Sequence, residues 1–248
     1  MLVRIIASEP SLEQLVNASG SDKVSHHQYH WAYEQALAPF RHRNTSLLEI
    51  GVQDGHSLKA WGAYFRHPDA HLTGVAFHNQ QEEKLDDPRM QILTADQSQH
   101  ADLARIASHG PFDVIIDDGS HVPSHQKLTF QTLWPHLRPG GLYAVEDIET
   151  SFWAETKLLY GYKLTREASI LNFFGQKVVD EVNAEFSRGK DATDILSIQF
   201  YRNLVLIAKR PLHYGSGRAY RWKKNRLPQP RTPVHVHRQH PPTHADKS

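Results

Sequence analysis

The sequence contains no cysteine among its 248 residues. This absence excludes disulfides, thiolate-bound zinc, iron–sulfur clusters and cysteine nucleophiles. Long apolar runs are also missing, since none approaches the roughly 20 residues that span a bilayer. The apolar stretch at residues 1–7 is brief and interrupted by Arg4. We therefore expect no signal peptide, no membrane contact and a cytoplasmic location.

An excess of charge is lacking as well, because 28 basic and 27 acidic residues give a net charge of +1. That balance argues against a nucleic-acid binder or a polybasic membrane protein. It is, however, the sum of two unlike parts: residues 211–248 carry +7 and residues 1–210 carry −6. The segment 211–248 also holds 6 of the 14 prolines, so we predict a disordered tail there. Its basic run at 221–226 leaves contact with RNA or an acidic partner open.

Short apolar runs alternate with segments of helical spacing between residues 46 and 147. The apolar runs are 46–51, 72–77, 90–96, 112–118 and 141–147, and the helical segments are about 57–66, 98–109 and 122–137. This alternation predicts right-handed βαβ units and a parallel sheet. Two further apolar runs, 195–201 and 204–209, are joined by only two residues, which requires an antiparallel hairpin. The sequence therefore predicts an α/β protein with a mostly parallel, seven-stranded sheet.

The chain divides into three predicted regions. Residues 1–45 contain two helical stretches, at about 11–19 and 27–39, and form an N-terminal cover segment. Residues 46–210 form the α/β core, in which a helical insertion at about 152–187 covers the site. Residues 211–248 form the basic, Pro- and His-rich tail.

Acidic side chains follow two strands of the predicted sheet. Asp117 and Asp118 end the fourth strand, and Glu146 and Asp147 end the fifth. In an open α/β sheet these carboxyl ends line the ligand site. Unpaired carboxylates there would raise one another's pKa, and a hard divalent cation such as Mg²⁺ would keep them ionised. His121, three residues beyond Asp118, suits proton acceptance from a hydroxyl.

Two other interpretations of these residues stay open. The first is that Asp118, Ser120 or Asp147 simply caps the helix that follows it. The second is a metal site built from His121 and His125, which have the i,i+4 spacing of zinc-binding helices. Pro123 lies between these histidines and fits only the first turn of a helix.

A glycine loop follows the first strand, in the segment Glu49-Ile-Gly-Val-Gln-Asp-Gly55. Gly51 and Gly55 allow a ligand to approach the backbone, and the next helix offers free N–H groups. The spacing is looser than a dinucleotide fingerprint, and the Lys-Ser/Thr pair of a P-loop is missing. The loop alone is therefore also consistent with an ordinary strand-to-helix turn.

Seven motifs, in order between residues 20 and 209, resemble a family of metal-dependent, S-adenosylmethionine (SAM)-dependent sugar O-methyltransferases. They are Gly20-Ser-Asp-Lys23, Leu47-Leu-Glu-Ile-Gly-Val52, Asp96-Gln97-Ser98, Ile116-Asp-Asp-Gly-Ser-His121, Pro139-Gly-Gly-Leu-Tyr143, Val145-Glu-Asp-Ile148 and Phe200-Tyr201-Arg-Asn-Leu204. The resemblance implies a Rossmann-like class I methyltransferase fold and methylation of a sugar or vicinal diol in natural-product or glycan tailoring. The tail lies outside it.

The same resemblance implies roles for individual residues. Mg²⁺ or another divalent cation would be held by Asp118, Glu146 and Asp147, and His121 would be the general base. The residues implied for SAM are Glu49, Gly51, Gly55 and Ser57 at the methionine end, Asp96 and Gln97 at the adenine side, and Asp117 nearby. The acceptor would be a sugar-containing small molecule, with Trp153 and Tyr162 of the insertion as pocket candidates. A homo-oligomer stays open.

The sequence departs from the family pattern after its second strand. Ala76 occupies the position where an acidic residue usually holds the cofactor ribose. Losing that partner would cost about 1–3 kcal/mol of binding free energy, unless His78, Asn79 or Glu82 replaces it. Two alternatives therefore remain: a metal-dependent, hydroxylase-like relative on this fold, and a binding protein that has lost catalysis.

Overall fold

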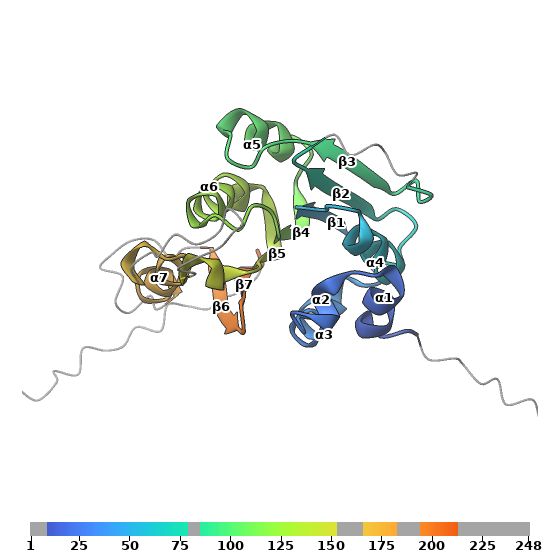
Figure 1. Cartoon of the computed structure of the whole chain (residues 1–248), viewed down its shortest axis with the longest axis horizontal. Coiled ribbons are helices and arrows are strands. Elements are labelled where there is room, and N and C mark those ends of the chain that lie inside the picture. Colours follow the sequence, from blue (N-terminus) through green and yellow to red (C-terminus); the bar gives the residue numbers. More distant parts are fainter. Residues whose placement is uncertain (1–8, 79–84, 153–165, 183–193, 213–248) are drawn as a thin grey trace, which may run out of the picture. The chain divides into compact units, whose positions relative to one another are not determined.

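The computed structural model describes residues 9–78, 85–152, 166–182 and 194–212. Seven strands form one sheet in the order β3-β2-β1-β4-β5-β7-β6 (Figure 1). Their bounds are β1 Ser46–Ile50, β2 His71–Ala76, β3 Met90–Thr94, β4 Phe112–Asp117, β5 Leu137–Val145, β6 Ile195–Tyr201 and β7 Leu204–Lys209. The first five strands pair in parallel, and β7 is antiparallel to both β5 and β6. The predicted α/β fold with a C-terminal hairpin is confirmed.

Helices connect and flank these strands. The α-helices are α1 Leu12–Ser19, α2 Asp22–Ser25, α3 His30–Leu37, α4 His56–Tyr64, α5 His100–Ala107, α6 Pro123–Leu133 and α7 Ile170–Lys177. Shorter turns occur at Ala38–Phe40, Trp134–His136, Ile148–Phe152 and Arg166–Ala168, and a π-helical turn at Val178–Val182. Within the described ranges, no helix has the length and hydrophobicity needed to cross a bilayer.

The N-terminal segment differs from its prediction in one respect. A helix was expected over about 27–39, but α3 begins only at His30. Gln28 has a positive φ of 58°, a conformation that cannot propagate a right-handed helix. The chain therefore turns sharply between α2, which the sequence did not predict, and α3.

The core consists of two apolar layers, one on each face of the sheet. Alternate residues of β1 face opposite sides, so Leu47 joins one cluster and Leu48 the other. The first cluster includes Leu12 of α1 and Trp61 of α4, both fully buried. The second includes Phe130 of α6. The predicted cover segment thus packs on the sheet, whereas the tail from residue 213 onward lies outside the described residues.

Strand register brings the carboxyl ends of three strands together. Ile50 of β1 lies beside Asp117 of β4, and Asp117 lies beside Val145 of β5. The residues that follow these strands therefore emerge side by side at one edge of the sheet. This placement assembles the polar cluster described next.

Candidate active site

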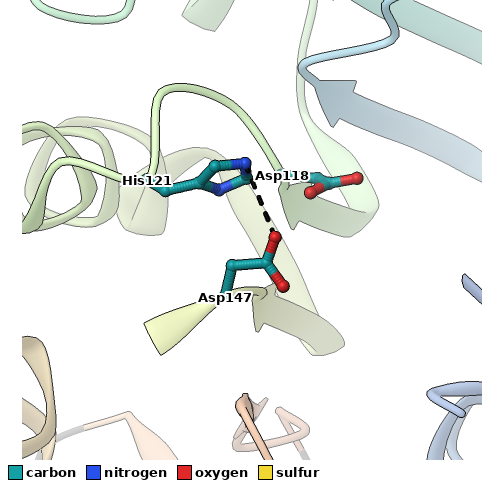
Figure 2. A group of neighbouring side chains, drawn as sticks. All are labelled: Asp118, His121 and Asp147. Carbon is teal, nitrogen blue, oxygen red and sulfur yellow. Dashed lines mark ion pairs between the residues drawn. The ribbon is translucent and has the colours of Figure 1, made fainter. Parts of the chain in front are cut away.

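Three side chains at this edge form a group that could hold a metal ion. Asp118, His121 and Asp147 each offer a ligand atom, and these atoms lie within 4.8 Å of one another. Figure 2 shows His121 and Asp118 on the loop after β4 and Asp147 after β5. The Nε2 atom of His121 lies 3.5 Å from Oδ2 of Asp147. The chemistry of the group, two carboxylates and one imidazole, fits a divalent cation.

Two of these residues have unusual backbone geometry. His121 has a φ of 54° and Asp147 a φ of 52°. Such left-handed conformations are uncommon for residues other than glycine and persist only where surrounding contacts enforce them. One such contact is the Thr150 hydroxyl, which donates to the carbonyl oxygens of both His121 and Asp147 at 2.8 and 3.0 Å. These hydrogen bonds hold the backbone of both residues at the edge of the cleft.

Glu146 lies next to this group but faces a different partner. Both of its carboxylate oxygens accept hydrogen bonds from Nζ of Lys23 at 2.8 Å, and Oε1 also accepts one from the Tyr33 hydroxyl at 2.7 Å. Lys23 is only 2% exposed. Its Nζ also lies 2.5 Å from Oδ2 of Asp118 and 3.5 Å from Oε1 of Glu49. Lys23 therefore contacts two predicted metal ligands and one predicted SAM residue.

The charges of this cluster shift one another's protonation. Burial alone would lower the pKa of Lys23, but Asp118, Glu146 and Glu49 outweigh it and hold that pKa well above its ordinary value. Burial, together with Asp118, raises the pKa of Glu146, while Lys23 and the Tyr33 hydroxyl oppose that rise. Burial likewise raises the pKa of Glu49. The buried ammonium thus favours the ionised form of these carboxylates.

Asp147 is held from its other side by the turn between α2 and α3. The Tyr29 hydroxyl donates to Oδ1 of Asp147 at 2.6 Å, and Nδ1 of His27 lies 3.3 Å from the same oxygen. The His27 ring stacks on Tyr29 with centroids 5.0 Å apart. The adjacent Asp22 raises the pKa of His27 to about 9, against the opposing effect of burial and with a further contribution from Asp147. Sequence reasoning assigned no role to these residues.

The glycine loop closes the opposite wall. Gly51 has a φ of 94°, and a Cβ there would lie 1.9 Å from the carbonyl oxygen of Asp118. Gly55 has a φ of 74° and precedes α4. The Ser57 hydroxyl donates to Oε2 of the fully buried Glu49 at 2.8 Å. The loop lines a cleft of about 270 Å³. The start of α4, the α2 segment and the group of Asp118, His121 and Asp147 line the rest of it.

Asp96 and Gln97, the residues predicted for the adenine side, are not among those that line this cleft. The buried Gln97 amide donates to Asp117 at 3.0 Å, and its carbonyl accepts from the Ser120 backbone N–H. Burial, opposed by the bond from Gln97, raises the pKa of Asp117 to about 6. Asp96 accepts a hydrogen bond from the Ser98 backbone N–H at 2.8 Å. Gln97 and Asp117 therefore shape the loop that carries Asp118 and His121.

The other described residues that the sequence suggested for the site lie outside the group of Asp118, His121 and Asp147. His125 is not part of this group, and its Nδ1 lies 2.9 Å from the Ser120 hydroxyl. Ala76 is buried at the end of β2, and His78 is exposed and packs against Phe77, with centroids 4.4 Å apart. Four predicted or suggested residues lie outside the described residues: Asn79, Glu82, Trp153 and Tyr162.

Comparisons with known proteins agree with this fold. Residues 48–148 match the family described as "Methyltransferase domain". The Streptomyces olivaceus 8-demethyl-8-alpha-L-rhamnosyl tetracenomycin-C 2'-O-methyltransferase is 38% identical over 216 residues, which are 81% of this chain and 55% of that protein. The Micromonospora griseorubida mycinamicin VI 2''-O-methyltransferase is 31% identical over 198 residues, 73% of this chain and 48% of that protein.

A solved structure agrees as well. MycE, a methyltransferase from the mycinamycin biosynthetic pathway in complex with Mg and SAH, superposes with a TM-score of 0.70 and 28% identity. The match covers 84% of this chain and 57% of MycE. Residues 48–148 therefore match a methyltransferase domain, and the fold is the Rossmann-like methyltransferase fold. The chain is homologous to the sugar O-methyltransferases of tetracenomycin and mycinamicin, and it spans about half the length of these relatives.

Proposed function

We propose that this chain transfers a methyl group from SAM to a hydroxyl of a sugar-bearing small molecule in natural-product tailoring. The observation that carries the proposal is the group of Asp118, His121 and Asp147 beside the glycine loop. A carboxylate-rich group and a histidine suit deprotonation of a hydroxyl, and the glycine loop suits a nucleoside-containing methyl donor. The relatives named above support the sugar acceptor and the methyl donor.

The residues present fit a divalent cation at this site. The resemblance implies Asp118, Glu146 and Asp147 as its ligands. Asp118 and Asp147 belong to the group that could hold the ion, and Glu146 is paired with Lys23. A bound Mg²⁺ would orient the acceptor hydroxyl and lower its pKa. A hard cation prefers oxygen ligands, so the imidazole of His121 is better suited to proton transfer than to binding Mg²⁺.

His121 is the proposed general base. Its Nε2 atom is the ring nitrogen that lies toward Asp147, so the acceptor proton would move to Nε2. The carboxylate of Asp147, 3.5 Å away, would stabilise the imidazolium that forms. The alkoxide oxygen would then form a bond to the methyl carbon of SAM as the carbon–sulfur bond breaks, which leaves S-adenosylhomocysteine (SAH).

Buried residues beside the cleft define its proposed donor side. Glu49 is fully buried and is oriented by the Ser57 hydroxyl. Gly51 allows the loop after β4 to approach β1 closely. We propose that the methionine end of SAM binds between this loop and the start of α4, where backbone N–H groups are available.

A turnover assay on the full chain tests the proposal. The chain is incubated with SAM, MgCl₂ and a panel of rhamnosides and other glycosides, and both SAH release and product mass are measured. We expect product that has gained CH₂, loss of turnover with EDTA, and a drop of about 100-fold or more in His121→Ala. The control is His136→Ala, an exposed histidine outside the cleft.

Two outcomes would contradict the proposal. Turnover that is indifferent to EDTA and to His121→Ala would refute the mechanism. A product that has gained oxygen instead of CH₂ would favour the hydroxylase-like alternative.

A further inference from the structure

Lys23 is the most completely buried cation beside the cleft, and none of the steps proposed above uses it. Lys23 belongs to α2, but its Nζ contacts carboxylates of the sheet. These are Glu49 within β1, Asp118 directly after β4 and Glu146 directly after β5. The three carboxylates come from three neighbouring strands. One ammonium group thus joins the predicted donor side of the cleft to its predicted metal side.

The burial of this cluster makes its charge balance important. Glu49 and Glu146 are 0% and 1% exposed, and Lys23 is 2% exposed. Repulsion between carboxylates is strong where water is excluded, and removing one partner of a buried ion pair leaves an uncompensated charge. The Tyr33 hydroxyl donates a hydrogen bond to Glu146 and the Ser57 hydroxyl donates one to Glu49, but neither hydroxyl brings a positive charge. Lys23 supplies that charge.

Lys23 contacts the group of Asp118, His121 and Asp147 through Asp118. Its Nζ contacts Oδ2 of Asp118 and both oxygens of Glu146, whereas Asp147 is contacted by Tyr29 and His27. Asp118 therefore contacts the Lys23 ammonium and also belongs to the group that could hold a metal ion. The Lys23 ammonium thus supplies a positive charge to Glu49, Asp118 and Glu146 even without a bound cation.

We propose that Lys23 is a positioning residue, an internal counter-charge that keeps Glu49, Asp118 and Glu146 together before a divalent cation binds. This inference rests on the proposed function for the identity of the metal site. Its consequence is specific: without Lys23, a divalent cation becomes the main source of positive charge for the cluster. Stability of the folded chain should then depend on that cation.

Thermal unfolding of the full chain, with EDTA or with MgCl₂, tests this proposal. In EDTA, Lys23→Met should unfold at a temperature lower by on the order of 10 °C than wild type. Mg²⁺ should recover a larger part of this loss in Lys23→Met than it adds to wild type. The double variant Lys23→Met/Glu146→Gln, which removes one negative charge, should recover stability without any metal.

A matched control distinguishes charge balance from ordinary packing. Lys209 is also buried, at 7% exposure, and its Nζ donates to the Trp134 carbonyl at 2.8 Å and lies 3.2 Å from Asp194. Lys209→Met should lose stability as well, but neither Mg²⁺ nor Glu146→Gln should restore it. The difference between the two lysine variants isolates the role of the carboxylate cluster.

Two results would overturn the proposal. One is an equal response of Lys23→Met and Lys209→Met to Mg²⁺. The other is a double variant that is no more stable than Lys23→Met, or that fails to fold. Restored stability without any methyl transfer would instead contradict only the proposed function, so the two failures are distinguishable.

Discussion

Substitution of Gly51 by alanine should destabilise the chain more than the same change at Gly55. At both positions the backbone has a positive φ, 94° and 74°, and an L side chain in that region costs about 1–2 kcal/mol of folding free energy. At Gly55 the new Cβ would meet nothing within 4 Å. At Gly51 it would lie 1.9 Å from the backbone oxygen of Asp118, which cannot rotate away as a side chain could.

The extra cost at Gly51 follows from what must move. The loop after β4 is anchored by a 3.0 Å hydrogen bond from the Asp118 N–H to the Ile50 carbonyl, and Gly51 itself donates to the Val75 carbonyl at 2.8 Å. Weakening each bond costs about 0.5–1.5 kcal/mol. We therefore expect a total loss of about 3 kcal/mol for Gly51→Ala and about 1–2 kcal/mol for Gly55→Ala. Urea unfolding of both variants measures this difference, and equal losses would refute the reasoning.

Two further predictions concern buried or locally paired polar groups. Tyr33→Phe removes the hydroxyl that donates to Glu146 at 2.7 Å and should lower the free energy of unfolding in urea by about 1.5–3 kcal/mol. Tyr143→Phe should change it little, because that buried hydroxyl has no hydrogen-bond partner among the described residues. Equal losses in the two variants would contradict this reasoning. The side-chain hydrogen bonds from Arg89 lower the pKa of Asp87 in the folded chain, so this carboxylate adds stability above its unfolded-state pKa and loses it as the pH falls through its folded pKa. Arg89→Met should therefore raise the Asp87 pKa measured by NMR. The stability that the chain loses at low pH through protonation of Asp87 should become smaller, and an unchanged pKa would contradict the pairing.

Strand and hairpin positions could be predicted because they depend on local patterns. The runs at 195–201 and 204–209 coincide with β6 and β7, since a two-residue connection permits only an antiparallel pair. The start of α3 could not be predicted in this way. It depends on the positive φ of Gln28, a conformation that tertiary contacts determine and that periodicity does not reveal.

The site residues that directly follow parallel strands could be predicted from the sequence, whereas contacts between residues far apart in the sequence could not. Asp118, His121 and Asp147 could be placed together because carboxyl ends of parallel strands share one edge. The burial of Lys23 could not be foreseen, since its partners Asp118 and Glu146 are 95 and 123 residues away in sequence. Its motif, Gly20-Ser-Asp-Lys23, was visible in the sequence, but the motif alone does not say what the ammonium contacts.

Binding of the methyl-donor product tests the central claim most directly, because it does not require the acceptor. The full chain, with MgCl₂, is titrated with SAH by isothermal calorimetry, alongside Gly51→Ala and the control Gly55→Ala. We predict saturable binding to one site per chain, with weaker binding in Gly51→Ala than in Gly55→Ala. The absence of binding up to about 1 mM SAH, which corresponds to about −4 kcal/mol, would contradict the account.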